Sequence, residues 1–533
     1  MIHRRRLLQL LVAHAASWSL SRTAWSQSRF NQNPFTLGVA SGSPTHDSVV
    51  LWTRLHSAKS SLLGLSEDLG HAAVPVRWEL AHDEQFSRLV QSGQVLASSA
   101  LAHSVHVEVA GLDADRWYFY RFMAGDFVSP VGRTRTVPKP DAVVVRLRLA
   151  YASCQKWEDG YFTAWRHMRE ENLDLVLFLG DYIYEYPALT SKVRVPTGGW
   201  VLTLDDYRQR YALYKGEADL QAMHAACPWL LTWDDHEVQN DYAGVHAGFS
   251  SAADPSVPSH FLARRAAAYQ AWYEHMPVRA SALTRGLAGL ASGAELRIYS
   301  RLPYGQLASL YLLDGRQYKD PQACTNGGGR GSGKVKPGTC PAWNDAVRSL
   351  LGRAQERWLD GEFAKPHAQE SGWNVLGQPT LFGQRDLKVG PGQTFWNDGW
   401  DGYAAARTRL TDALRQHAVA NPVILGGDLH ENWVGHVKAD YADPNSVSLG
   451  VEFCGTSISS RSGGNAKTAE RLAENPHFVF AEAQRKGYGV VEFTPTQLTT
   501  TLRVVDDVTR QDTKIETLAR FTVQAGRPVV ERV

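Results

Sequence analysis

Ionisable residues follow four apolar segments of this chain, at the point where each segment ends. The residues are Cys154, Asp181, the pair Asp234 and Asp235, and Asp428. Short apolar runs predict buried strands, and the carboxyl ends of parallel strands form the sheet edge at which ligands bind. A single aspartate after a strand is more often a turn or capping residue. The occurrence of such residues at four strand ends together, however, indicates a functional site.

The residues next to these aspartates indicate metal binding. Glycine precedes both Asp181 and Asp428, which lets the chain turn sharply and brings a short carboxylate to the sheet edge. Side-chain direction in an extended segment repeats every two residues, so Asp428 and His430 point to the same side. Asp235 and His236 add a carboxylate and an imidazole. Such a cluster repels itself unless cations occupy it.

Alternating strands and helices must position these side chains. Apolar runs that predict strands alternate with stretches of helical pattern, which is typical of an α/β layered fold over residues 143–533. The expected strands are 143–152, 173–179, 228–233, 309–313 and 422–425, and the expected helices are 162–171, 261–275 and 407–418.

The preceding region, residues 33–138, has a different pattern. Short runs alternate apolar and polar residues between turn residues, which predicts an immunoglobulin- or fibronectin-like β-sandwich. Gly111 and Leu112, followed by Tyr118 and Tyr120, are typical of a tyrosine corner. We expect this region to be a positioning or surface-binding module. Two prolines within 138–141 mark the linker to the second region.

Several motifs in one order resemble the PhoD family of alkaline phosphatases. They lie at residues 35–42, 50–54, 151–154, 180–185, 233–238, 313–317 and 427–432, and the similarity extends over about residues 33–530. The resemblance implies a calcineurin-like metallophosphoesterase domain, a β-sandwich flanked by helices, behind the N-terminal sandwich. It further implies that hydroxide held by iron attacks phosphate esters, at a centre with one ferric ion and two calcium ions.

The resemblance also assigns roles to individual residues. Cys154, Asp181, Tyr184 and Asp428 match positions that hold iron, Asp235 and Asn240 match calcium positions, and His430 is a ligand or supports one. Thiolate and tyrosinate stabilise ferric iron, whereas calcium takes oxygen ligands. His236 is the candidate to contact the substrate or protonate the leaving group, and Arg316 could reach a phosphate oxygen. Cys154 could instead be an inert buried thiol, and Tyr184 a packing residue.

Other functions compete with this interpretation. A phospholipase D-like diesterase acting on phospholipid or teichoic-acid polymers would use the same residues. A non-catalytic surface-binding module would have lost metal positions, and here they are intact. Residues 328–334 have the spacing of a phosphate-binding P-loop, but Val335 stands where Ser or Thr must hold magnesium. We therefore expect a surface loop there.

The N-terminus predicts export. Residues 1–27 combine a cluster at Arg4, Arg5 and Arg6 with an apolar run too short for a membrane span, and the order resembles a signal for the twin-arginine export machinery. A Sec signal would also deliver the protein to the periplasm or the medium. We expect no transmembrane segment. A net charge of +2 excludes a global field that would recruit nucleic acid.

Cysteine use agrees with an exported enzyme. The chain has five cysteines, an odd number, so at least one is unpaired. Cys324 and Cys340 bracket a glycine-rich loop and could form a disulfide after export.

Overall fold

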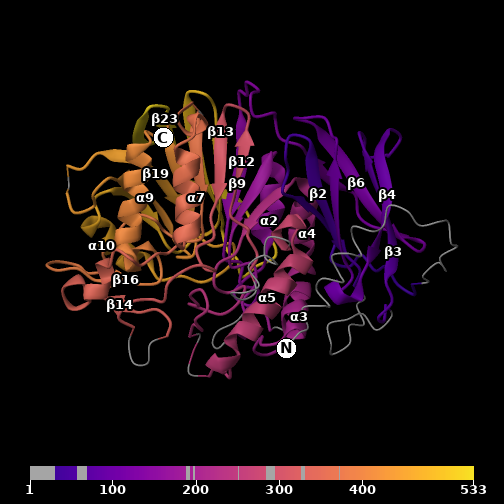
Figure 1. The fold of residues 1–533 in the computed structure, drawn as a ribbon, viewed down its shortest axis with the longest axis horizontal. Helices are drawn as coiled ribbons and strands as arrows, with labels where there is room; N and C mark the ends of the chain where they lie inside the picture. Colours follow the sequence, from indigo (N-terminus) through magenta and orange to yellow (C-terminus); the bar gives the residue numbers. More distant parts are fainter. Residues whose placement is uncertain are drawn as a thin grey trace.

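The structure is a computed structural model in which two large sheets lie face to face. It describes residues 30–56, 69–187, 193–195, 198–249, 251, 253–283, 295–325, 330–370, 372–443 and 445–533, so the expected signal peptide at 1–27 lies outside the described residues. Helices cover the outer faces of both sheets (Figure 1). The predicted α/β layered fold is therefore confirmed.

The first sheet contains the three parallel strands that lead to the site. β9, β10 and β11 are neighbours and run parallel. Antiparallel strands extend the sheet beyond β9, whereas beyond β11 the next strand is β1, which is parallel to it and is followed by antiparallel strands. In the described residues its order is β24 (Arg527–Arg532), β23 (Ile515–Gln524), β22 (Gln497–Val505), β21 (Lys486–Phe493), β9 (Leu147–Ala152), β10 (Leu175–Leu179), β11 (Trp229–Thr232), β1 (Val39–Gly42), β2 (Ser48–Arg54) and β5 (Ser104–Ala110).

The second sheet contains the strand that ends before Asp428. β13, β15, β17 and β19 are parallel, and β12, β18 and β20 are antiparallel to their neighbours. Its described order is β12 (Ser300–Tyr304), β13 (Ala308–Leu312), β15 (Trp373–Gly377), β17 (Pro422–Gly426), β19 (Ser448–Cys454), β18 (Asn432–Lys438) and β20 (Phe478–Glu482).

Apolar side chains hold the layers together. The inner faces of the two sheets share one core, in which Leu149 and Leu177 of the first sheet meet Val375 and Leu425 of the second. The described helices cover the outer faces: α2 (Thr163–Met168), α3 (Leu204–Lys215), α4 (Ala218–Ala226) and α5 (Phe261–His275) on the first sheet, and α7 (Arg353–Phe363), α8 (Pro366–Glu370) and α9 (Ala404–Gln416) on the second, while α10 (Asn465–Glu474) lies near β20.

The N-terminal region is a β-sandwich at one side of the molecule (Figure 1). Strands β1, β2 and β5 face a separate sheet across an apolar core, and the Tyr118 hydroxyl accepts a hydrogen bond of 2.9 Å from the Asp113 amide, as in a tyrosine corner. That separate sheet contains β4 (Leu89–Ala97), β3 (Val74–Ala81), β6 (Trp117–Ala124), β7 (Phe127–Val128) and β8 (Gly132–Arg135).

A short ribbon, β14 (Lys334–Val335) with β16 (Phe395–Trp396), follows the loop with P-loop spacing. Gly328 and Gly329 of that motif lie outside the described residues. In the described part the chain continues into a 3-10 turn at Pro337–Thr339 instead of the α-helix that a P-loop requires. The Cys324–Cys340 disulfide is present. No helix among the described residues has the length and apolar character needed to span a bilayer.

Candidate metal centre

Strand ends from both sheets meet at one edge of the sandwich. Register pairs Phe178 of β10 with Ala152 of β9, so the segments that follow these strands run side by side. Backbone hydrogen bonds continue between them, from the Cys154 amide to the Gly180 carbonyl at 3.0 Å and from the Gln155 amide to the Asp181 carbonyl at 3.1 Å. These contacts fix the position of Cys154 relative to Asp181.

Two glycines allow the segments to approach closely. A side chain at Gly180, which has φ +102°, would place its Cβ 2.6 Å from the backbone nitrogen of Asp234. At Gly427 the added Cβ would lie 2.3 Å from the Ser153 hydroxyl, which belongs to the opposite sheet layer. The glycines predicted to permit sharp turns are therefore also required for packing.

Four of the site residues predicted from the sequence have left-handed backbone conformations. The φ angles are +59° at Cys154, +58° at Asp181, +68° at Asp428 and +57° at His430. Such conformations are costly for residues other than glycine and concentrate at functional sites. The packing of the surrounding fold offsets that conformational cost and keeps these residues in place.

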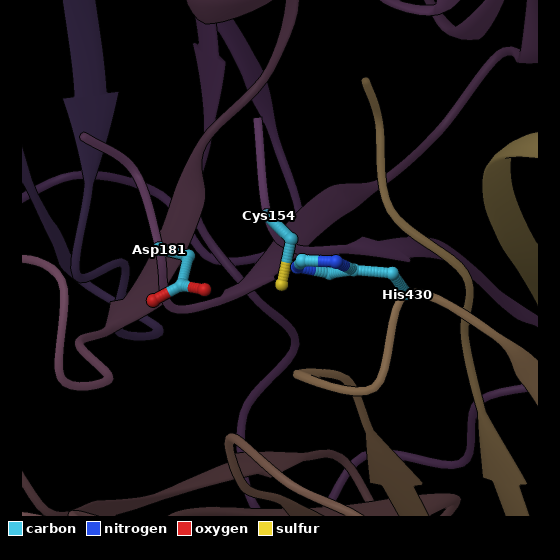
Figure 2. A group of neighbouring side chains, drawn as sticks. All are labelled: Cys154, Asp181 and His430. Carbon is cyan, nitrogen blue, oxygen red and sulfur yellow. The ribbon is translucent and has the colours of Figure 1, made fainter. Parts of the chain in front are cut away.

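Cys154, Asp181 and His430 form the first group of potential ligands. One ligand atom from each lies within 4.8 Å of the others, and the three side chains converge from different segments (Figure 2). Tyr184 belongs to the same group, because its hydroxyl donates to Asp181 Oδ2 at 3.0 Å and lies 3.1 Å from His430 Nε2. The Arg461 carbonyl, 2.6 Å from Nδ1, orients the His430 ring.

Asp181 is shared with a second group that contains Asp235 and His236. Glu185 holds His236, with Oε2 at 2.7 Å from Nδ1, and the imidazole ring packs on Tyr184 with 4.2 Å between centroids. A carboxylate that belongs to two ligand groups is suited to bridge two cations.

A third group consists of oxygen ligands only. One carboxylate oxygen from each of Asp235, Asp241 and Asp398 lies within 4.8 Å of the other two. Ser332 donates to Asp241 through its hydroxyl at 2.5 Å and its amide at 3.1 Å, and Lys319 donates to Asp398 at 2.6 Å. Carboxylate oxygens are the ligands that calcium prefers.

Asp241 and Asp398 were not among the residues selected from the sequence. Asp398 follows the two-residue strand β16, and Asp241 lies within a turn, so neither follows an apolar run. Asn240, the neighbouring residue that was selected, donates its side-chain amide to the Phe249 carbonyl at 2.9 Å. Its assignment as a calcium ligand stays a prediction.

Asp428 and Arg316 lie beside the ligand groups. Thr380 donates to Asp428 at 2.9 Å, and burial together with the charge of Asp235 raises the pKa of Asp428 to about 6. Arg316 is buried and pairs with Asp234, with Asp398 at 2.7 Å and with Asp235 at 3.5 Å. Its Nη1 has no hydrogen-bond partner among the described residues.

The electrostatics of the centre favour bound cations. Burial and, to a smaller extent, the charge of Asp181 raise the pKa of the Cys154 thiol well above its ordinary value. The same two causes raise the pKa of the Tyr184 hydroxyl. Burial opposes a charged imidazole, but Asp181, Asp235 and Glu185 outweigh it and raise the pKa of His236. The protein alone therefore leaves these donors short of positive charge.

The donor set fits metal ions on two counts. In the described part of the chain, the Oδ1 atom of Asp181 is buried without a hydrogen-bond partner, which a cation would supply. Burial and the charge of Lys486 lower the pKa of His430 to about 3, so its ring is neutral and able to bind a metal. The groups therefore match a site for more than one cation.

Comparisons with known proteins cover both regions of the chain. A model of the PhoD-like phosphatase family matches residues 149–502, and a model of the N-terminal domain of PhoD-like phosphatases matches residues 20–138. Alkaline phosphatase D of Bacillus subtilis (strain 168) is 42% identical over 512 residues, which cover 95% of this chain and 83% of that protein. A solved structure of PhoD has a TM-score of 0.86 at 42% identity, over 95% of this chain and 93% of that one.

Proposed function

Because the chain belongs to the PhoD-like phosphatase family, we propose that it hydrolyses phosphate esters at the metal centre described above. The observation that carries this proposal is that Asp181 belongs to two ligand groups, one of which contains His236 and Asp235, the carboxylate that Arg316 contacts. A silent surface-binding module has no use for such an arrangement.

The donor types support ferric iron in the first group and calcium at the carboxylates of the other two groups. Thiolate and tyrosinate from Cys154 and Tyr184 suit ferric iron, and the carboxylates around Asp235 suit calcium. When bound, these cations would supply Lewis acidity, and ferric iron would also lower the pKa of a water molecule.

The chain's own residues would perform the remaining steps. Arg316 Nη1, which has no hydrogen-bond partner within the described part of the chain, can donate to a non-bridging phosphate oxygen, while its other nitrogens stay paired with carboxylates. Glu185 fixes the His236 ring through Nδ1, so the Nε2 proton is the one available for the leaving oxygen. Burial of the centre strengthens both interactions.

We infer that the protein is exported. The basic and apolar pattern of residues 1–27 supports passage through the twin-arginine machinery. The Cys324–Cys340 disulfide supports an oxidising compartment. Fractionation of expressing cells tests this inference: the mature protein is expected outside the cytoplasm, and replacement of Arg4 and Arg5 by lysine should retain the precursor inside.

One preparation of the exported protein tests the activity and the metals. We expect a coloured protein with iron and calcium by mass spectrometry, and hydrolysis of chromogenic phosphate esters at alkaline pH. A colourless, iron-free protein with full activity would refute the iron assignment. The ratio of monoester to diester rates decides between a phosphatase and a phospholipase D-like diesterase.

A further inference from the structure

Lys156 lies beside the metal centre, two residues after Cys154. Its Nζ is 4.4 Å from the ring centroid of Tyr186 and 5.6 Å from that of Tyr184. The Tyr184 hydroxyl in turn contacts Asp181 at 3.0 Å. The ammonium group therefore lies one aromatic ring away from the first ligand group.

Hydrogen bonds hold the backbone of Lys156 to the centre. Its amide donates to Ser460 Oγ at 3.0 Å, and its carbonyl accepts from Ser459 Oγ at 2.9 Å. Ser460 Oγ also lies 2.8 Å from both the Cys154 carbonyl and the Tyr184 hydroxyl. The backbone of Lys156, from which its side chain extends, is thus fixed to the same loops that position the ligands.

Other cations near the centre are already engaged. Arg316 and Lys319 are paired with carboxylates, Lys486 donates to the carbonyl of His430 at 2.8 Å, and Arg210 donates to backbone carbonyls. Lys156 takes part in no salt bridge with the residues that the structure describes, and its contacts are with aromatic rings. Its charge is therefore available to a ligand.

The acidic groups near Lys156 do not prevent an anion from reaching its ammonium group from solvent. Glu158 is buried, whereas Lys156 is partly exposed. Asp159 is held by Arg461: its Oδ1 lies 3.7 Å from the Arg461 Nε, and its Oδ2 accepts a hydrogen bond of 3.2 Å from the Arg461 backbone amide. Lys156 and Arg210 both act on Glu158 through their charge. An anion that approaches from solvent would meet the Lys156 ammonium before these carboxylates.

We propose that Lys156 forms an anion subsite that binds a second negative group of the substrate, next to the phosphoryl group at the metal centre. The ring of Tyr184 separates the ammonium from the ligands, so Lys156 faces the alcohol portion of the ester rather than the scissile phosphate. The favoured substrates are phosphate esters whose alcohol portion carries a carboxylate or a further phosphate. This inference rests on the proposed function.

A matched pair of esters tests the subsite. 3-Phosphoglycerate and glycerol 3-phosphate differ chiefly by a carboxylate in place of a hydroxymethyl group. We expect Lys156→Met to lower the kcat/KM ratio of the first ester to the second about fivefold, a usual effect for a partly exposed charge pair. Lys156→Arg should keep most of the preference, and added salt should reduce it in the wild type and in Lys156→Arg but not in Lys156→Met. An equal loss for both esters would overturn the subsite.

Binding of phosphonates separates the subsite from the proposed activity. Calorimetry compares 3-phosphonopropionate with 3-hydroxypropylphosphonate on the metal-loaded wild type, on Lys156→Met and on Lys467→Met, an exposed control in α10. We expect about a fivefold loss for the carboxylated ligand in Lys156→Met alone. The same loss in a protein that hydrolyses no ester would uphold the subsite and refute the proposed function. Equal affinity in all three proteins refutes the subsite.

Discussion

Cys154 is the donor that distinguishes the first ligand group. Its thiol lies with Asp181 and His430, whereas Cys227 is buried in an apolar core beneath the helices. We expect Cys154→Ala to lose the proposed iron and its visible absorption, and to lower kcat/KM at least about hundredfold, because replacement of even the partners of metal ligands costs ten- to hundredfold. Metal analysis, absorption spectra and kinetics measure this. Cys227→Ala should keep iron and colour, and a Cys154→Ala protein with normal iron would contradict the assignment.

Gly180 is the residue whose replacement should disturb two site loops together. Alanine there must adopt φ +102° and place its Cβ 2.6 Å from the Asp234 backbone. We expect Gly180→Ala to lower the free energy of unfolding by about 2–4 kcal/mol and to weaken metal binding, since Asp181 must shift. Chemical denaturation and metal titration test both effects. Gly361→Ala in α7 has open space and should leave metal binding unchanged.

The sequence allowed some ligands to be predicted and not others, for a physical reason. Asp181 follows a buried strand and a glycine, and this local pattern already implies a carboxylate at a sheet edge. Asp241 and Asp398 follow no such strand; Asp241 meets Asp235 through a turn of its own loop, and Asp398 meets it only because a distant loop folds against this one. An acidic residue in an irregular segment has no local feature that distinguishes it from a turn residue.

At the scale of elements, the segment closed by the Cys324–Cys340 disulfide supports the third ligand group. Ser332 within this segment donates to Asp241, and Gly333 donates to the Asn397 side chain at 2.6 Å, next to Asp398. The ribbon of β14 and β16 and the stacking of Trp343 on Phe395, with 5.4 Å between centroids, complete the support. Two of the three carboxylates thus depend on one braced segment.

Removal of the disulfide should therefore weaken binding of the proposed calcium ion at Asp235, Asp241 and Asp398. We expect the double variant Cys324→Ala with Cys340→Ala to lose about tenfold in calcium affinity, because supporting contacts of a metal ligand usually contribute this much. Calcium titration by calorimetry measures it. Ser332→Ala, with the disulfide intact, should show part of the same loss. Identical calcium binding by wild type and double variant would refute the role of this segment.

Strands and helices were predictable where the residue pattern was strong. The expected helix 261–275 is α5, and the expected strand 173–179 contains β10, Leu175–Leu179. The expected helix 162–171 is α2 followed by a 3-10 turn at Arg169–Glu171, so its last three residues are wound more tightly. The pattern of apolar residues shows which face of an element is buried. The residues at which the element begins and ends depend on its capping residues and on the elements packed against it.

At the scale of the molecule, the two regions share one sheet. β1 pairs with β2 of the N-terminal sandwich and, through Gly42 and Trp229, with β11 of the catalytic region. The change of pattern near residue 138 predicted a β-sandwich over 33–138 and an α/β layered region over 143–533, but not the pairing of β1 with β11, because a pairing between strands so distant in sequence leaves no local signal. The sandwich is therefore part of the support of β11, which leads to Asp235.

Lys215 lies in the contact between these regions. It ends α3, and its Nζ is 4.2 Å from the ring centroid of Trp52 in β2. Burial lowers the pKa of Lys215 from 10.5 to about 7. Between these pH values the unfolded chain binds a proton that the folded protein does not, so the free energy of unfolding contributed by this residue rises with pH.

Replacement of Lys215 by methionine should remove this pH dependence. At pH 6 the amine is charged in both states and burial destabilises the fold, so Lys215→Met should be more stable than wild type, by on the order of 3–5 kcal/mol. The gain should shrink as pH rises through the window and vanish near the unfolded pKa, where the amine is becoming neutral in both states. Melting temperatures of the two proteins between pH 6 and pH 10 measure the gain. Lys467→Met, exposed on α10, should change little at any pH. A gain for Lys215→Met that is constant with pH would show that packing against Trp52, and not the buried charge, limits the stability of the contact between the two regions.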